Sequence, residues 1–341
     1  MEIFLILSRE HETLPSGEVK AVLEAEEIEY DIKYDEGGVM VIDSPAKITS
    51  ILGKRMGYAH EICDLLFETT LENLEKDFTS FNWSSVLEKD FAVRVKKIES
   101  ITELDSLKTE KKLGNIVKSQ SNNVKVNLES PLTFIRILVA GSKVMVGKRS
   151  FKINKKHFYE LKPHKRPFFY PGSMSPKLAR CMVNLSRIKK GDLLMDPFCG
   201  TGGILIEAGI VGARLIGTDI DEKMVNGTVE NLKHCGISDF HIFQSDARNL
   251  DLEEKVRAVV TDPPYGISAS TAGEDSGKLY SDFLISVSDN MVEKGRICMA
   301  TPHYVDVNEL IKGTKFKILE RHEIRMHKSL TRVISIMEKN D

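Results

Sequence analysis

The chain has 341 residues, which is enough for two or three domains of ordinary size. Hydrophobic residues make up 41% and charged residues 29%, a balance that excludes disordered, collagen-like and low-complexity classes. The net charge of −2 hides an asymmetry, because residues 1–80 carry −11, residues 81–170 carry +11 and residues 171–341 carry −2. The basic middle segment favours a phosphate-rich partner, although a solvated lysine-rich face would give the same count.

Cysteine content and hydropathy further limit the class of protein to which the chain can belong. The cysteines are odd in number and form no C-x-x-C or Cys/His cluster, which argues against a disulfide framework or a zinc finger. They are Cys63, Cys181, Cys199, Cys235 and Cys298. No apolar run approaches the roughly 18 residues that span a bilayer, and residues 1–12 lack the features of a signal peptide. We therefore expect a reduced, soluble, cytoplasmic protein with no membrane or metal partner.

The first half of the chain predicts two small α+β regions. In residues 1–52 the expected elements are a strand at 2–7, a helix at 16–26 and a strand at 39–42. In residues 53–150 they are a helix at 58–74, a strand at 91–98, a helix at 109–119, strands at 124–128 and 132–140, and a hairpin at 141–148. The alternation within 91–98 places Arg94 and Lys96 on one face, which makes that face basic.

The second half has a different pattern. Residues 151–172 mix basic and aromatic residues with three prolines, a composition that disfavours regular elements, and we interpret them as a linker. From residue 173 to 341, strands alternate with helical stretches, which predicts βαβ units and a parallel sheet. The expected strands are residues 193–195, 214–218, 240–243, 258–261 and 297–300. Residues 315–326 and 331–337 predict an antiparallel hairpin at the sheet edge.

A glycine-rich turn follows the first strand of this half. Leu193 to Ala208 (LLMDPFCGTGGILIEA) predicts a strand, a turn and a helix, and glycine lets the backbone approach a ligand closely. The dinucleotide pattern G-x-G-x-x-G fails, because Leu205 stands where its third glycine belongs. Asp196 before the turn is poorly placed against a pyrophosphate and suits a cationic or amino-acid-bearing ligand.

Acidic residues also follow the next two strands. Asp219 can accept both hydroxyls of a ribose, as in nucleoside binding by doubly wound folds, or can cap the next helix. Asp246 is a candidate partner for an adenine amine and equally a turn residue. Because successive parallel strands end at one edge, a single nucleoside could contact Asp196, Asp219 and Asp246.

The sequence TDPPYG at 261–266 follows the fourth strand. Two consecutive prolines hold a rigid turn, which would fix the Asp262 carboxylate and the Asp262 and Pro263 carbonyls as acceptors. Tyr265 offers a ring on which a base can stack. Acceptors that converge on the hydrogens of a ring amine make its nitrogen more nucleophilic, so the motif favours chemistry on an exocyclic amine. A plain strand-ending turn is the alternative.

In this order and spacing, DPFCGTGG, GTDID, SDAR and DPPYG resemble the motifs of class I S-adenosylmethionine-dependent methyltransferases that modify exocyclic amines of bases. Arg166 to Arg180 (RPFFYPGSMSPKLAR) looks like the additional cofactor-contacting segment upstream in such enzymes. Residues 53–150 are similar to a THUMP RNA-binding domain. The whole order resembles the archaeal tRNA guanine-N2 methyltransferases that act on guanosine 10, and Asp262 in place of Asn favours this group over the guanosine 6 enzymes.

This resemblance implies a fold, a cofactor and a substrate. The fold is α/β, a Rossmann-like class I methyltransferase sheet with an antiparallel last strand at 173–341, preceded by a ferredoxin-like N-terminal region, the THUMP domain and the linker. The cofactor is S-adenosyl-L-methionine, and the substrate is the N2 amine of a tRNA guanosine, giving N2-methylguanosine, N2,N2-dimethylguanosine or both. The THUMP region is expected to bind the acceptor stem and 3′ end of tRNA. A small activating protein partner also fits, although the residues do not define one.

Three groups of residues carry these expectations. The catalytic candidates are Asp262, Pro263 and Tyr265. The cofactor-binding candidates are Asp196, Phe198, Gly200, Gly202, Asp219, Ile220, Asp246, Ala247 and Asp262. The RNA-binding candidates are Lys96, Lys111, Lys112, Lys118, Lys148 and Arg149.

Two other functions stay open. A DNA adenine-N6 or rRNA amino-methyltransferase would share DPPY and the glycine turn, although the basic middle segment has no evident DNA-recognition counterpart. An RNA-binding scaffold with a degenerate methyltransferase domain is the non-enzymatic alternative. Intact Asp196, Asp219, Asp262 and Tyr265 weigh against degeneration.

Overall fold

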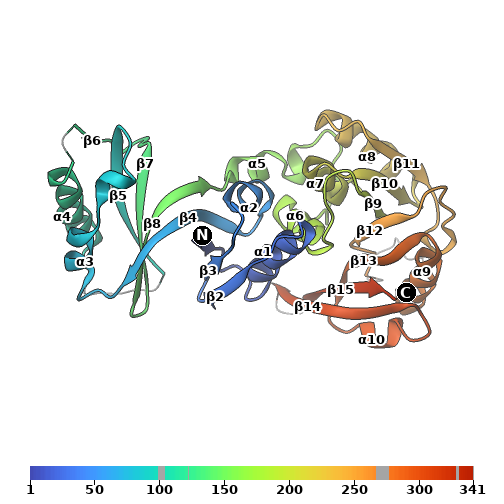
Figure 1. Cartoon of the computed structure of the whole chain (residues 1–341). Helices are drawn as coiled ribbons and strands as arrows, with labels where there is room; N and C mark the ends of the chain where they lie inside the picture. The colour runs from blue at the N-terminus through green and yellow to red at the C-terminus, as the bar shows by residue number, and fades with distance from the viewer. Residues whose placement is uncertain (99–103, 122, 266–275, 328–329, 341) are drawn as a thin grey trace. The chain divides into compact units, whose positions relative to one another are not determined.

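The computed structural model describes residues 1–98, 104–121, 123–265, 276–327 and 330–340 (Figure 1). The chain forms two compact units. The first unit consists of Met1–Glu10, Ile28–Lys54 and Ala59–Ile153, and the second consists of His11–Glu27, Arg55–Tyr58 and Asn154–Asp341. Each unit is therefore assembled from three separate stretches of chain. The domain bounds expected from the sequence, at residues 52, 150 and 172, stay a prediction.

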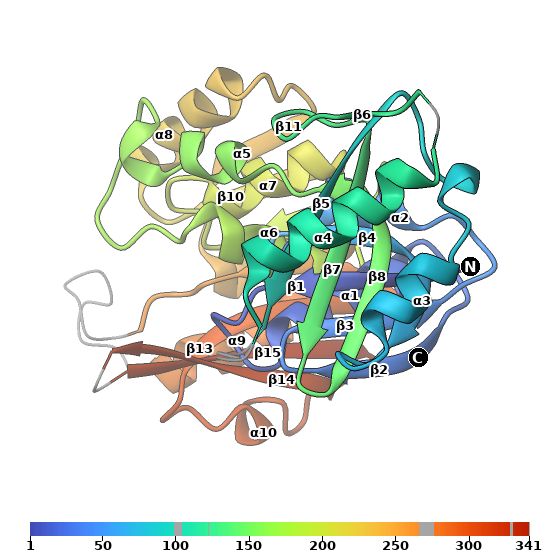
Figure 2. The same ribbon diagram turned by 90° about the vertical axis from the view of Figure 1, so that its left-hand side faces the viewer.

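The first unit is built on an eight-stranded sheet in the order β2-β3-β1-β4-β8-β7-β5-β6. Its strands are β1 (Glu2–Leu7), β2 (Asp31–Glu36), β3 (Val39–Asp43), β4 (Ala59–Thr69), β5 (Asp90–Lys97), β6 (Lys125–Val126), β7 (Thr133–Ala140) and β8 (Lys143–Lys152). Figure 2 shows α3 (Leu74–Ser80) and α4 (Ser106–Ser119) across one face of β5, β7 and β8. The side chains of Phe78 and Trp83 are fully buried in the core there. A short helix, α2 (Thr49–Arg55), precedes β4.

One predicted helix is a strand. Apolar residues recur at helical spacing in 58–74, but Ala59–Thr69 forms β4, and a helix begins only at Leu74. β4 pairs antiparallel with β1 on one side and with β8 on the other. This long-range pairing satisfies the backbone hydrogen bonds of β4. It outweighs a local apolar pattern that fits the period of a helix as well as the period of a strand. The other expected elements of this half are present, although the strand at 124–128 shortens to β6.

The second unit contains a seven-stranded sheet in the order β11-β10-β9-β12-β13-β15-β14. Its strands are β9 (Leu193–Asp196), β10 (Arg214–Asp219), β11 (Phe240–Gln244), β12 (Val256–Thr261), β13 (Met291–Pro302), β14 (Phe316–His327) and β15 (Leu330–Lys339). Strands β9 to β13 pair in parallel, whereas β15 runs antiparallel between β13 and β14. The predicted mostly parallel sheet with a reversed last strand and an edge hairpin is confirmed.

Helices cover both faces of this sheet, because its strands direct alternate apolar side chains to opposite sides. Leu194 and Val260 belong to the core on one side, and Met195 and Val259 belong to the core on the other. The first core is completed by α1 (Leu14–Ala25), α6 (Pro176–Leu185), α7 (Gly203–Val211) and α8 (Glu222–His234). The second is completed by α9 (Ser276–Asp289) and α10 (Val307–Leu310).

Helix α1 belongs to the second unit although its sequence lies within residues 1–52. Glu18 on α1 is fully buried and accepts hydrogen bonds from the backbone amides of Gly57 and Tyr58, at 2.9 and 2.8 Å. Nδ2 of Asn184 on α6 donates to the same carboxylate at 2.8 Å. Burial raises the pKa of Glu18, and these three donors oppose that shift. The carboxylate thus fastens three stretches of chain in one core.

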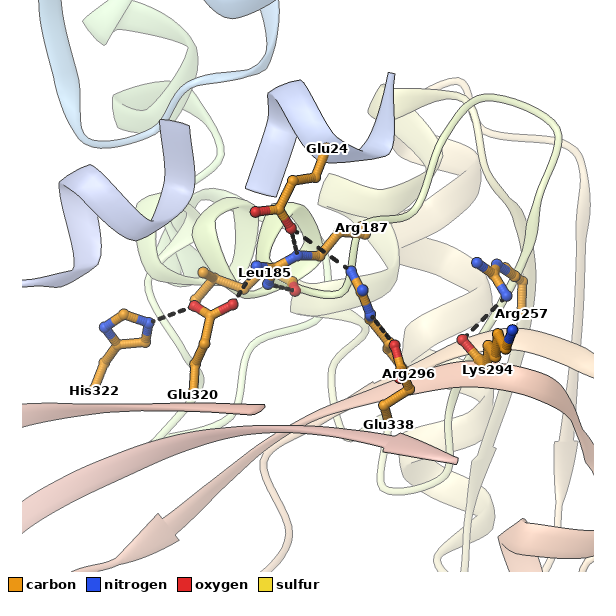
Figure 3. A network of polar contacts seen from close by, with 9 residues as sticks. All are labelled: Glu24, Leu185, Arg187, Arg257, Lys294, Arg296, Glu320, His322 and Glu338. Atoms are coloured by element: carbon orange, nitrogen blue, oxygen red, sulfur yellow. Dashed lines mark hydrogen bonds and ion pairs between the residues drawn. The ribbon is translucent and has the colours of Figure 1, made fainter. Parts of the chain in front are cut away.

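Ion pairs at the other end of α1 connect it to the sheet (Figure 3). Nε of Arg187, just after α6, lies 2.9 Å from Oε2 of Glu24, and its guanidinium also pairs with Glu320 of β14. Arg296 of β13 joins this network, because it lies 4.0 Å from the same Glu24 oxygen and pairs with Glu338 of β15 at 3.2 Å. The network therefore links α1, α6 and the reversed strand.

Residues 151–172 contain short regular elements, although their composition disfavours such elements, and their role as a linker stays a prediction. β8 continues to Lys152, α5 covers Lys155–Glu160, and a 3₁₀ turn, η2, covers Pro163–Lys165. Asn154 caps α5 by accepting a hydrogen bond from the Lys156 amide at 3.1 Å. Within the described ranges, no helix combines the length and apolar character that a bilayer span needs.

Candidate active site

The carboxyl ends of the parallel strands place four acidic residues along one edge of the second sheet. β9 ends at Asp196 and β10 at Asp219, while Asp246 and Asp262 follow β11 and β12. Ligands of doubly wound sheets bind at this edge, because the loops and helix N-termini face it. The structure therefore gathers the cofactor-binding and catalytic candidates at one edge.

Asp196 is the buried acid of this edge. It is 1% exposed, and its Oδ1 accepts hydrogen bonds from Oγ1 of Thr261 at 2.7 Å and from the Phe198 amide at 3.2 Å. Burial raises the pKa of Asp196 to about 7, and the nearby Asp219 and Asp262 carboxylates add to the rise. A buried carboxylate beside two others is stabilised by positive charge, so this part of the edge favours a cationic ligand.

The glycine turn is held by Asp219. Oδ2 of Asp219 accepts a hydrogen bond from the Gly200 amide at 2.9 Å, and Oδ1 accepts one from the Asp221 amide at 3.0 Å. Gly200 and Gly202 have φ values of +52° and +77°, which L side chains rarely adopt. Asp221, not Asp219, caps α8 by accepting from the Lys223 amide. Asp219 is therefore free of the capping role that the sequence left open.

The surroundings of Asp219 and Asp246 differ. Burial raises the pKa of Asp219, and beside it Ile220 is 64% exposed, which offers an apolar surface to a flat base. Asp246 instead pairs with Arg248 at 2.6 Å, and this hydrogen bond lowers its pKa. Ala247 between them is buried. The contact with Arg248 fits the turn interpretation of Asp246 and leaves an adenine contact as a prediction.

Residues 168–173 are fixed against the glycine turn, chiefly by Asn231 on α8. This fully buried side chain accepts from the Phe168 amide at 3.0 Å and donates to the carbonyls of Phe168 and Thr201, each at 2.9 Å. Gly227 makes room for the Phe168 ring, because a Cβ there would lie 2.0 Å from its Cδ1. Oγ of Ser173 lies 3.0 Å from Oγ1 of Thr201. Sequence reasoning missed Asn231 and Gly227, which carry no motif signal.

Arg166 brings unpaired donors to the same turn. It is 6% exposed, and Nε donates to the Leu161 carbonyl at 2.9 Å. Its two terminal nitrogens have no hydrogen-bond partner among the described residues. A Cβ on Gly203, the first residue of α7, would lie 3.2 Å from Nη1. Burial lowers the pKa of Arg166, and the nearby Glu207 opposes that shift. A buried guanidinium with free donors fits a carboxylate ligand.

Asp262 is held on both sides. The Tyr265 hydroxyl donates to Oδ1 of Asp262 at 2.6 Å, and Nη2 of Arg332 on β15 lies 3.2 Å from Oδ2. The Arg332 guanidinium is 5.5 Å from the centroid of the Tyr265 ring. Burial raises the pKa of Asp262, whereas the charge of Arg332 and the Tyr265 hydrogen bond lower it. Sequence reasoning missed Arg332, because TRVIS has no local signal for a site residue.

Two further tyrosines fix the backbone of the tetrapeptide. The Tyr280 hydroxyl on α9 donates to the Pro264 carbonyl at 2.8 Å, and the Tyr304 hydroxyl donates to the Tyr265 carbonyl at 3.1 Å. Pro263 is buried. These contacts hold the turn rigidly, as the paired prolines predict.

The RNA-binding candidates lie in the first unit and differ in their contacts. Lys111 and Lys118 are exposed two turns apart on α4. Lys112 pairs with Glu75, and Lys148 pairs with Glu88 at 3.0 Å. Arg149 lies 3.5 Å from the centroid of the Phe134 ring and pairs with Glu61, and Lys96 lies on β5. Their role in RNA binding stays a prediction.

The strand order with β15 reversed, together with the acids that end β9 and β10 and the Asp-Pro-Pro-Tyr turn after β12, defines a class I methyltransferase. Residues 163–334 match a family model described as RMKL-like, methyltransferase domain, and residues 41–230 match one described as DNA methylase. A tRNA (guanine(10)-N2)-dimethyltransferase of Methanothermobacter thermautotrophicus is 51% identical, over 99% of this chain and 100% of its own length. One from Methanocaldococcus jannaschii is 35% identical, over 98% and 99%. The chain belongs to the tRNA (guanine(10)-N2)-dimethyltransferase family.

Solved structures share the fold at low sequence identity. TrmN from Thermus thermophilus superposes with a TM-score of 0.59 at 20% identity, covering 99% of this chain and 100% of its own. The protein SMU.472, solved as a complex with SAH, gives a TM-score of 0.54 at 15% identity, covering 100% and 98%. These likenesses extend over both units.

Proposed function

We propose that this protein transfers methyl groups from S-adenosyl-L-methionine to the N2 amine of a guanosine in tRNA, with position 10 as the expected site. The products would be N2-methylguanosine, N2,N2-dimethylguanosine or both. The observation that carries the proposal is the doubly held Asp262 carboxylate beside the Tyr265 ring. It lies in a chain 51% identical to a protein named for this reaction. The THUMP-like residues 53–150, which include the RNA-binding candidates, would hold the acceptor stem and 3′ end.

The residues of the edge fit S-adenosyl-L-methionine, which supplies a methyl group activated by a sulfonium charge. Asp219 keeps further lone pairs on both oxygens for a ribose diol, and the exposed Ile220 would cover the base. The part of the edge around Asp196 favours a positively charged group of the ligand. The free nitrogens of Arg166 would take the amino-acid carboxylate.

The chain's own residues then account for the selectivity toward an amine. A paired, stacked guanine has to leave its helix before N2 can reach the site, as base-modifying enzymes generally require. Tyr265 would stack on the extruded base, while Asp262 and the Pro263 carbonyl accept the two amine hydrogens and direct the nitrogen lone pair at the methyl group. Burial raises the pKa of the Cys199 thiol well above its usual value, and the proposed reaction needs no covalent enzyme intermediate.

A methyl-transfer assay with labelled cofactor tests the proposal on tRNA, ribosomal RNA and DNA in parallel. DNA is the second candidate, because residues 41–230 match a model described as DNA methylase. We expect label in tRNA only, recovered as N2-methylated guanosine after nuclease digestion, and none with an Asp262→Ala variant. Label in adenine N6 of DNA, or in ribosomal RNA alone, would contradict the assignment.

A further inference from the structure

A second basic surface lies on the second unit, outside the RNA-binding candidates of the first. The ammonium groups of Lys162 and Lys165 lie 5.1 and 3.5 Å from the centroid of the Tyr159 ring, which is 56% exposed. Lys155 and Lys156 are exposed at the start of the same segment. We call Lys155, Lys156, Tyr159, Lys162 and Lys165 the linker face.

The charge of the linker face is poorly compensated. Among the described residues, the only carboxylate paired with one of these lysines is Glu160, 3.4 Å from Lys156, and both partners are exposed. Lys162 and Lys165 approach the same ring, whose negative face attracts each ammonium group while the two positive charges repel each other. A polyanion bound across them would relieve that repulsion.

The segment that carries the linker face is anchored to the second unit by its inner side chains. On its inner side, Nε2 of His157 lies 3.4 Å from Oε2 of the fully buried Glu207, and the Arg180 guanidinium lies 5.8 Å from the centroid of the Phe158 ring. Leu161 packs against the core below. Since these contacts hold the inner side, the outer lysines lose less freedom on binding than lysines of a loose loop would.

We propose that the linker face binds the sugar-phosphate backbone of the substrate RNA beside the active-site edge. Lys165 directly precedes Arg166, whose guanidinium lies against Gly203 at the start of α7, so this surface adjoins the glycine turn. Exposed lysines such as Lys162 and Lys165, which pair with no carboxylate among the described residues, match phosphates through charge alone, which holds an RNA in place without selecting a base. The inference rests on the proposed function, because it assumes an RNA substrate.

The test is a Lys162→Gln, Lys165→Gln double variant in the full-length protein, with binding to tRNA measured between 50 and about 300 mM salt. Losing two phosphate contacts should weaken binding about tenfold near 0.1 M salt and reduce the slope of log affinity against log salt by about 2. KM for tRNA should rise, whereas kcat at saturating tRNA, cofactor affinity and the thermal midpoint should stay unchanged.

A matched control is Lys233→Gln, Lys255→Gln. Both lysines are exposed, one at the end of α8 and one just before β12, at the opposite edge of the sheet. This variant makes the same charge change and should bind tRNA with nearly the affinity and salt slope of the unmodified protein. A Lys162→Arg, Lys165→Arg variant should restore wild-type binding, since it keeps the charge.

Wild-type affinity and slope in the glutamine variant would overturn the inference and leave the proposed function standing. A glutamine variant that binds tRNA more weakly, with an unchanged salt slope and a lowered thermal midpoint, would overturn the inference too. The two lysines would then contribute to folding and not to phosphate binding. If the unmodified protein methylates DNA but no RNA, the proposed function fails first and the inference fails with it.

Discussion

The Tyr265 hydroxyl donates a hydrogen bond to Oδ1 of Asp262 across 2.6 Å. The ring proposed to stack on the extruded base thus also orients the carboxylate proposed to accept its amine hydrogen. Arg332 holds the other carboxylate oxygen at 3.2 Å. Because both oxygens are held before any substrate arrives, little reorganisation is needed at the moment of transfer.

The two contributions of Tyr265 can be separated by substitution. Tyr265→Phe keeps the ring and removes the hydrogen bond to Asp262. It should lower kcat about tenfold with little change in KM for tRNA, since a hydrogen bond to a charged group is worth roughly 1.5 to 3 kcal/mol. Tyr265→Ala should lower kcat further and raise KM. Steady-state kinetics decide this, and full activity of the phenylalanine variant would show that only the ring matters.

Asp262 should control the chemical step alone. Asp262→Ala and the nearly isosteric Asp262→Asn should each slow methyl transfer at least about a hundredfold, the usual scale for a positioned acid-base or charge-stabilising group. Affinities for tRNA and cofactor should stay close to those of the unmodified enzyme. Single-turnover kinetics with enzyme in excess measure the step directly. Transfer by either variant at a near-normal rate would contradict the mechanism.

Removal of Arg332 should move the acidic limb of the pH–rate profile. The charge of Arg332 lowers the pKa of Asp262 against the effect of burial, so Arg332→Gln should raise that pKa. A protonated Asp262 accepts amine hydrogens poorly. The activity of the variant should therefore fall at a higher pH than that of the unmodified enzyme. Profiles of kcat/KM from pH 5 to 9 would show the shift, and coinciding acidic limbs would refute it.

Asp219 should govern cofactor affinity. Asp219→Ala removes the proposed ribose acceptors and the hydrogen bonds that hold Gly200 and Asp221. Affinity for S-adenosyl-L-methionine should fall at least about tenfold, as expected for losing charge-assisted hydrogen bonds. Calorimetric titration measures it. Asp221→Ala is the control, because it removes only the cap of α8 and should lower stability by about 1 kcal/mol with cofactor affinity retained.

Asp196 should make folding stability depend on pH. Its pKa rises from 3.8 to about 7 in the folded protein, so between these values the folded state binds more protons than the unfolded state. The free energy of unfolding therefore falls as pH rises through this interval. Asp196→Asn keeps an oxygen for the Thr261 and Phe198 donors and removes the ionisation. Its gain in thermal midpoint should be larger at pH 8 than at pH 5, and equal gains would contradict the buried charge.

The same ionisation should appear in cofactor binding. A cationic ligand favours the ionised form of Asp196, so affinity for S-adenosyl-L-methionine should strengthen as pH rises through about 7. Asp196→Asn should bind more weakly at high pH and lose this dependence. Titration at pH 6 and pH 8 measures both effects, and identical pH dependence in the two proteins would assign it to another group.

The local sequence was sufficient to predict the acidic residues at the active-site edge. It was not sufficient to predict the residues that hold this edge in place. Asp196, Asp219 and Asp262 stand where apolar strands give way to polar residues, and parallel pairing then collects them. Arg332 comes from the reversed strand β15, and only the register of the whole sheet places it beside Asp262. Asn231 was likewise invisible, because its three hydrogen bonds join loops far apart in the chain.

Long-range pairing also explains the errors in the first half. The apolar spacing of 58–74 fits a helix, but the residues around Cys63 lie in β4 between β1 and β8. The charge count along the sequence likewise located the basic segment, but it could not show which of its basic side chains contact acidic or aromatic residues of the same unit. Lys112 and Lys148 proved to be paired with glutamates, and Arg149 packs on Phe134.

The chain passes from one unit to the other five times, because the stretches that build the two units alternate along it. A single protease cut cannot divide it into two complete units. A fragment that begins at residue 154 would lack α1 and residues 55–58. It would therefore lose Leu14, Ala21 and Tyr58 from the core around α6 and α7. A minimal methyltransferase therefore has to be made by splicing residues 11–27 and 55–58 onto 154–341, since truncation alone leaves an open core.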